Sequence, residues 1–247
     1  MMKKFGFTLA EVLITLGIVG VIAAMTIPTF VTNAQNKANA ARLSSTISNL
    51  ENAFGIMMVQ EGANTFDETE FYEEFVTSPT SGKTMAKLDQ YLKINGSGSF
   101  ADYYEGTSIN SIVKEIGNSD LNINHGSSDI LYQTKNGAII HFSKSIRTIT
   151  EQKAEENGLS INSAKLILQI DVNGAEKPNL NGRDFFLFML GPDGKLYPAG
   201  GKTYSYIIFG DDKYLYTNED SRFACTGSKR SIGCTARLIE NNFVVDY

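Results

Sequence analysis

The sequence predicts an α+β fold in which one long N-terminal helix, half transmembrane and half amphipathic, packs on a small head built around an antiparallel sheet. Three observations predict this class. An uncharged run extends from Val12 to Asn36, an amphipathic helical pattern follows it, and turn-bounded apolar runs alternate through the second half of the chain. With 247 residues and 42% hydrophobic content, the chain has room for one soluble domain beside a membrane segment.

The first element is the uncharged run. Its 25 residues would extend about 37 Å as a helix, enough to cross the roughly 30 Å hydrocarbon core of a bilayer. Lys3 and Lys4 are the only basic residues before it, so the positive-inside rule keeps the N-terminus in the cytoplasm and places the rest of the protein outside. Glu11 is unexpected here, because a carboxylate near a membrane span needs a partner. A secretory signal peptide is one alternative, but its apolar core rarely contains an acid such as Glu11; a plain signal anchor is the better alternative.

The second element continues the same helix. Apolar residues recur at spacings of 4, 3, 4 and 3 and mark one face of an amphipathic helix that should end near Gly62; they are Leu43, Ile47, Leu50, Phe54 and Met57. We therefore expect one helix over residues 7–60 and a globular head over residues 61–247.

The head should contain two short helices and a sheet. Residues 66–77 and 83–93 are predicted to be helical, and the Gly/Ser/Tyr-rich segment 95–108 is predicted to be a loop. Asn136-Gly137 between two β-branched runs is the strongest hairpin signal. Strands are expected at 165–172 and 185–190, with a short helix and a final strand closing the chain.

The two cysteines, Cys225 and Cys234, are predicted to form a disulfide in the extracytoplasmic head. Closing a loop of that length would stabilise the fold by about 2.7 kcal/mol in the chain-entropy model. Two unpaired buried thiols are the alternative, whereas a zinc site lacks its close ligand pairs.

The charge balance is acidic. The net charge is −5, and without residues 1–6 there are 20 basic against 27 acidic residues, which gives −7. General attraction to DNA or anionic lipid is therefore disfavoured.

The N-terminus carries a more specific pattern, in which a short basic leader ends in Gly6 and is followed by "FTLAE" and the apolar run. It resembles the N-terminus of the type IV prepilins and type II secretion pseudopilins, specifically over residues 3–30. The resemblance implies that a leader peptidase cleaves after Gly6, removing residues 1–6, and methylates Phe7. It also implies that Glu11 is the assembly residue, that Pro28 lies at a helix kink, and that the head is pilin-like.

Physical chemistry gives these positions a reason. Cleavage would create an amine on Phe7 that is cationic at neutral pH, and this amine is a suitable partner for the Glu11 carboxylate of a neighbouring subunit in a low-dielectric filament core. Pro28 removes a backbone donor and locally opens the helix. Expected partners are copies of the chain or other pilin-like subunits, the prepilin peptidase, the inner-membrane assembly machinery and membrane lipid.

Other motifs are weaker. No acid–base, nucleophile or phosphate-loop pattern nominates an enzyme, and no cofactor is expected. Asp171, Asn173, Asp184 and Asp193 lie near glycine turns and could bind calcium, although turn chemistry explains them better and we assign no metal site.

One loop departs from the acidic average. Lys229 and Arg230 would lie at the tip of the disulfide-closed loop. They could contact an acidic neighbour or an anionic ligand such as DNA, or simply be solvated.

We expect a filament subunit of a type IV pilus or a secretion pseudopilus, held in the inner membrane before assembly and then in a periplasmic or surface filament. The alternative is a monomeric, membrane-anchored binding protein or enzyme.

Overall fold

The computed structural model describes residues 7–78, 82–105, 109–116, 130–143, 166–203, 205, 214–221, 223–226 and 231–247. Its elements in chain order are α1 (Leu9–Glu61), η1 (Phe66–Glu68), α2 (Glu70–Thr77), α3 (Gly82–Tyr91), β1 (Ile94–Gly98), α4 (Phe100–Tyr103), α5 (Ile109–Ile112), β2 (Ile130–Thr134), β3 (Ile139–Ser143), β4 (Leu166–Asp171), β5 (Phe185–Leu190), β6 (Leu196–Pro198) and α8 (Cys234–Glu240).

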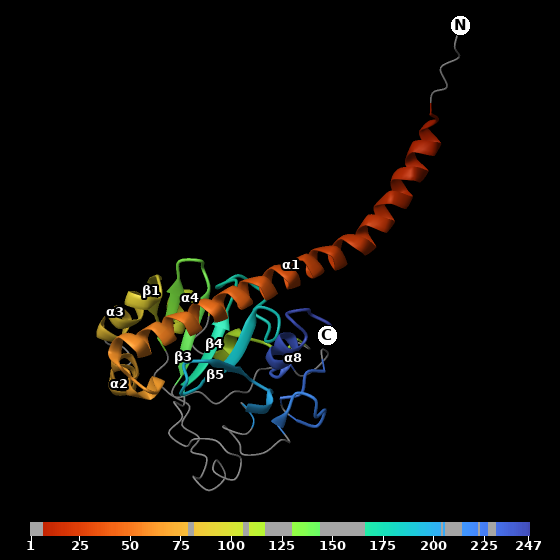
Figure 1. The fold of residues 1–247 in the computed structure, drawn as a ribbon. Helices are drawn as coiled ribbons and strands as arrows, with labels where there is room; N and C mark the ends of the chain where they lie inside the picture. The colour runs from red at the N-terminus through yellow and green to blue at the C-terminus, as the bar shows by residue number, and fades with distance from the viewer. Residues whose placement is uncertain are drawn as a thin grey trace.

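Helix α1 dominates the molecule. Its C-terminal half lies across the head, and its N-terminal half projects away with no other described element beside it (Figure 1). The helix ends where Gly62 adopts a left-handed conformation (φ 68°) and donates its N–H to the carbonyls of Met58 and Val59. Only glycine adopts this conformation without strain, so Gly62 ends the helix.

The sheet is a six-stranded antiparallel meander in the order β1-β2-β3-β4-β5-β6, which confirms the predicted fold class. The Asn136-Gly137 turn joins β2 to β3, and Ile130 pairs with Phe142 in that hairpin. In β4 and β5, Leu168 pairs with Phe188. Every residue of β3, β4 and β5 is buried, because these central strands are covered on both faces.

The two faces of the sheet contact different partners. One face packs against α1, whose buried residues are Ala40, Leu43, Thr46, Leu50, Ala53, Phe54 and Met57. On this face Phe54 meets Phe142 edge to face, with ring centroids 6.4 Å apart. The opposite face packs against Phe100, Val113, Phe223 and Ile232. The alternation of strand residues between the two clusters is the period of two that a pleated sheet imposes.

Two details of the head differ from the sequence-based expectations. The segment predicted as a loop at 95–108 contains β1 and α4. β1 has the sequence Ile-Asn-Gly-Ser-Gly, which has low β-propensity, and it forms because β2 supplies a hydrogen-bonding edge. The expected final strand is absent, since the residues after α8 are turn and coil.

Candidate assembly site on the N-terminal helix

The outer tip of α1 contains the two described residues of the cleavage and assembly pattern, Phe7 and Glu11. Thr8 is the N-cap of the helix, and its backbone N–H and hydroxyl both donate to Glu11 Oε2, at 2.8 and 2.7 Å. The Glu11 backbone N–H donates to the Thr8 hydroxyl at 3.3 Å. This reciprocal arrangement is a capping box, which satisfies backbone donors that the first helical turn leaves without partners.

The capping box changes the account of Glu11. Within one chain the carboxylate already has a partner in Thr8, so it is not isolated in the apolar segment. All its side-chain hydrogen bonds within the described residues use Oε2. Oε1 therefore remains available for a donor from another chain. Thr8-x-x-Glu11 is readable in the sequence as a capping box, and the sequence interpretation missed it.

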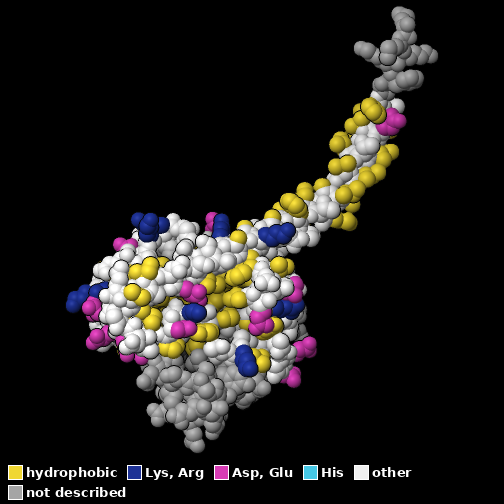
Figure 2. All heavy atoms as spheres, viewed as in Figure 1, with side chains coloured by type: hydrophobic (Ala, Val, Ile, Leu, Met, Phe, Trp, Pro, Cys, Tyr) yellow, Lys and Arg dark blue, Asp and Glu magenta, His cyan; other side chains and the backbone are white. Residues whose placement is uncertain are grey.

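Around this tip the helix surface is apolar and uncovered. Phe7 is 89% exposed, and the large apolar residues from Leu9 to Val31 are exposed along the whole projecting half. Figure 2 shows these hydrophobic side chains along the helix as far as the head. The helix is long and apolar enough to cross a membrane, and none of its most apolar window is buried in the molecule. Exposed apolar surface of this extent is unfavourable in water.

Pro28 lies inside α1, and the helix continues through it from Leu9 to Glu61. It cannot donate a hydrogen bond to the preceding turn. α1 bends between its projecting half and the half that lies on the head (Figure 1). The Pro28 carbonyl accepts a hydrogen bond from the hydroxyl of Thr32, one turn further along the helix, at 3.0 Å.

The remaining predicted site residues are distributed over the chain. Gly6, Lys229 and Arg230 lie outside the described residues, so the cleavage site and the basic loop remain predictions. Cys225 and Cys234 are joined by a disulfide, with Cα atoms 4.8 Å apart. The disulfide lies in the head at the start of α8, at the other end of the molecule from the tip of α1 (Figure 1).

The four calcium candidates do not form one cluster. Asp171 accepts hydrogen bonds from the Tyr104 hydroxyl (2.9 Å) and the Asn173 backbone N–H (3.3 Å). Asp184 accepts from two backbone N–H groups, of Asn179 (3.1 Å) and Leu180 (2.5 Å). These contacts are turn chemistry of the kind that aspartates supply without metal.

Asp193 has a separate, exposed position. It accepts hydrogen bonds from the Lys195 backbone N–H at 3.2 Å and the Tyr197 hydroxyl at 2.8 Å. Within the part of the chain that the structure describes, no group of three or more His, Cys, Asp or Glu side chains could hold a metal ion.

Burial changes the acidity of the two inner aspartates. Loss of solvent raises the pKa of Asp171 well above its usual range, and the neighbouring Asp184 carboxylate adds to the effect. Burial also raises the pKa of Asp184 to about 6, against the opposing effect of its backbone donors.

Comparison with known proteins identifies the N-terminal segment. Residues 1–27 match the family model described as the prokaryotic N-terminal methylation motif, which is the prepilin-type cleavage and methylation signature. The motif and the exposed apolar helix support a precursor of the type IV pilin or pseudopilin kind. They imply a prepilin peptidase and other pilin subunits as partners, with membrane anchoring before assembly. No curated protein and no solved structure matched the chain.

Proposed function

We propose that the protein is a structural, non-enzymatic subunit of a type IV pilus or a type II secretion pseudopilus. In this proposal it is cleaved after Gly6, methylated on Phe7 and assembled through α1. The observation that carries the proposal is the projecting half of α1, which is apolar, uncovered and tipped by the prepilin-type signature.

The apolar half of α1 suits both the membrane-anchored stage and the assembled stage of such a subunit. Before assembly, lipid covers it, and Lys3 and Lys4 hold the leader in the cytoplasm so that the head lies outside. During assembly, the helices of neighbouring subunits replace the lipid. In both states these side chains are kept out of water, which is favourable by roughly 25 cal/mol for each Å² of apolar surface that is buried.

Glu11 links the subunits in this account. Thr8 holds Oε2, which orients the carboxylate at the outer tip and leaves Oε1 for a second donor. The methylated amine of Phe7 in a neighbouring copy is a cation of the right sign, and a charge-assisted hydrogen bond between the two is stronger than a neutral one. In a filament core without water, leaving either the Glu11 carboxylate or the Phe7 ammonium group unpaired would be strongly unfavourable.

The test compares Glu11→Ala with Thr8→Ala in cells that carry the assembly machinery. Glu11→Ala removes both the cap and the carboxylate, whereas Thr8→Ala removes only the cap hydroxyl. We expect both variants to insert and to be cleaved, because neither adds a charge to the apolar segment. Filaments sheared from the cells should contain at least tenfold less of the Glu11→Ala variant and near wild-type amounts of the Thr8→Ala variant.

The control measurement is the amount of processed subunit in the membrane, determined by immunoblot. Equal filament yields from Glu11→Ala and the wild type would contradict the proposed role. So would an equal loss from both variants, since the cap alone would then account for the effect.

A further inference from the structure

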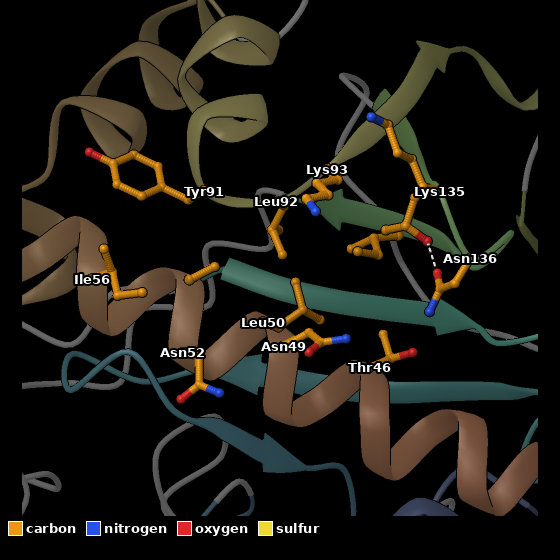
Figure 3. Close-up of a pocket in the computed structure, with 13 residues that line it drawn as sticks. Thr46, Asn49, Leu50, Asn52, Ile56, Tyr91, Leu92, Lys93, Lys135 and Asn136 are labelled. Atoms are coloured by element: carbon orange, nitrogen blue, oxygen red, sulfur yellow. Dashed lines mark hydrogen bonds between the residues drawn. The ribbon is translucent and has the colours of Figure 1, made fainter.

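We propose that a groove between α1 and the β2–β3 hairpin receives the acidic corner of a neighbouring copy of this chain. The groove is lined by parts of α1, by residues 91–93 and by the hairpin turn, and it encloses about 430 Å³ (Figure 3). The inference rests on the proposed assembly function and deepens it, because it assigns a contact between heads in addition to the contact between helices.

The groove combines an apolar floor with a basic rim. Leu50, Ala53 and Ile140 form part of the floor. Lys93 and Lys135 lie at the rim, both exposed, and the Lys135 backbone N–H donates to the Lys93 carbonyl at 3.0 Å, which joins the two residues through their backbones. No Asp or Glu lines the groove, and neither lysine has an ion pair among the described residues.

One feature indicates that the groove lacks an occupant in the single chain. Ile56 lines the groove and leaves 51% of its surface in water, which is unfavourable for a large apolar side chain.

The same chain carries a surface of complementary charge, here named the acidic corner. It comprises the end of α1, η1 and α2, and its six carboxylates are uninterrupted by any basic residue: Glu61, Asp67, Glu68, Glu70, Glu73 and Glu74. Lys87 of α3 pairs with Glu70. Lys83 and Lys87 line one hollow with Glu70, Glu73 and Glu74, so α3 offsets part of the negative charge of the corner. Glu73 is exposed on α2 and is available to a neighbour.

Assembly through Glu11 brings these two surfaces to the same level. If the Phe7 amine of one copy meets Glu11 of the next, parallel helices are offset by four residues, or about 6 Å. Residue 57 of the first copy then lies level with Glu61 of the second, so the Ile56 end of the groove is within one helical turn of the start of the neighbour's acidic corner. The opposite shift would separate them.

Such a contact joins two different surfaces and therefore continues from copy to copy. A head-to-tail contact that does not close into a ring generates a helical filament. Charge complementarity also sets the register and disfavours other neighbours. A nucleic acid would meet the basic rim, but it would also be repelled by the acidic corner and by the net charge of −5.

The experiment uses the full-length chain in cells that assemble filaments. Copies with Lys135→Cys and one epitope tag are mixed with copies carrying Glu73→Cys and another tag, and sheared filaments are oxidised. Because each copy carries one new cysteine, any product that contains both tags joins two chains. We expect such dimers, and we expect none when Lys177→Cys replaces Lys135→Cys, since Lys177 is exposed but lies outside the groove.

Charge reversal provides the second readout. Lys135→Glu and Glu73→Lys should each lower filament yield severalfold, and the two together should restore it, whereas Lys177→Glu should leave the yield unchanged. Filaments of normal yield that form no cross-link and ignore both reversals would overturn the groove contact alone. Cross-links to a different subunit would overturn its assignment to a second copy. If the wild-type chain enters no filament, the assembly function fails together with this contact.

Discussion

Asp171 and Asp184 are fully buried at neighbouring positions of the sheet, one at the end of β4 and the other just before β5. Their carboxylates hold the connection between these strands through the backbone N–H groups of Asn173, Asn179 and Leu180. The same burial makes ionisation unfavourable, so the turn is held at an electrostatic cost that depends on pH.

The sign of that dependence follows from the raised pKa of Asp184, which is about 6 in the fold against an ordinary value of 3.8. Between pH 4 and 6 the folded state binds more protons than the unfolded state, so stability rises as the pH falls through this window. A shift of that size corresponds to about 3 kcal/mol. The lowered pKa of exposed Asp102 acts only below this window.

We therefore predict that the head of the detergent-solubilised chain is harder to unfold with urea at pH 5 than at pH 7. Asp184→Asn should reduce this dependence without abolishing it, because it removes one titrating group while buried Asp171, whose pKa is also raised, still titrates. The measurement is the free energy of unfolding from near-UV circular dichroism at each pH. A wild-type head that is less stable at pH 5, or an unchanged slope in Asp184→Asn, would contradict this assignment.

At the scale of elements, α1 is one helix with two environments. Its head-side half buries residues between Ala40 and Met57 against the sheet, whereas its projecting half buries none within the molecule. The first half therefore contributes to folding of the head, and under the proposed function the second serves insertion and assembly.

A pair of substitutions separates these contributions. Leu50→Ala should lower the free energy of unfolding of the head by about 2–5 kcal/mol, because Leu50 is 1% exposed and truncation leaves a cavity. Ile18→Ala, at a residue that is 56% exposed, should change it by less than about 0.5 kcal/mol. Urea unfolding of both variants measures this, and equal losses would mean that the two halves are not independent.

Periodicity and turn chemistry explain which elements could be predicted from the sequence. The spacing from Leu43 to Met57 and the Asn136-Gly137 turn are local patterns, and both correspond to observed elements. β1 was missed because its Gly- and Ser-rich sequence becomes a strand only by pairing with β2. The final strand was predicted wrongly, since an apolar run alone does not provide a pairing edge.

At the scale of the whole molecule, the candidate assembly site was partly predictable because part of it is a local sequence pattern. Glu11 is conspicuous in an apolar run, whereas its capping contact with Thr8 required attention to a three-residue spacing. The groove was not predictable, because the fold brings its lining together from residues 46–56, 91–93 and 134–140. Under the two proposals, the helix provides a surface for lipid or neighbouring helices and the head provides another for neighbouring heads.

The measurement that tests this account most directly is the intact mass of the mature chain isolated from cells with a prepilin peptidase. We predict a chain that begins at N-methyl-Phe7, lacking residues 1–6 and carrying one additional methyl group. Gly6→Val should retain the leader, because a side chain at that position obstructs the close approach of the peptidase to the backbone. A mature chain that still begins at Met1, or one cut beyond Ala24, would contradict the assignment as a filament subunit.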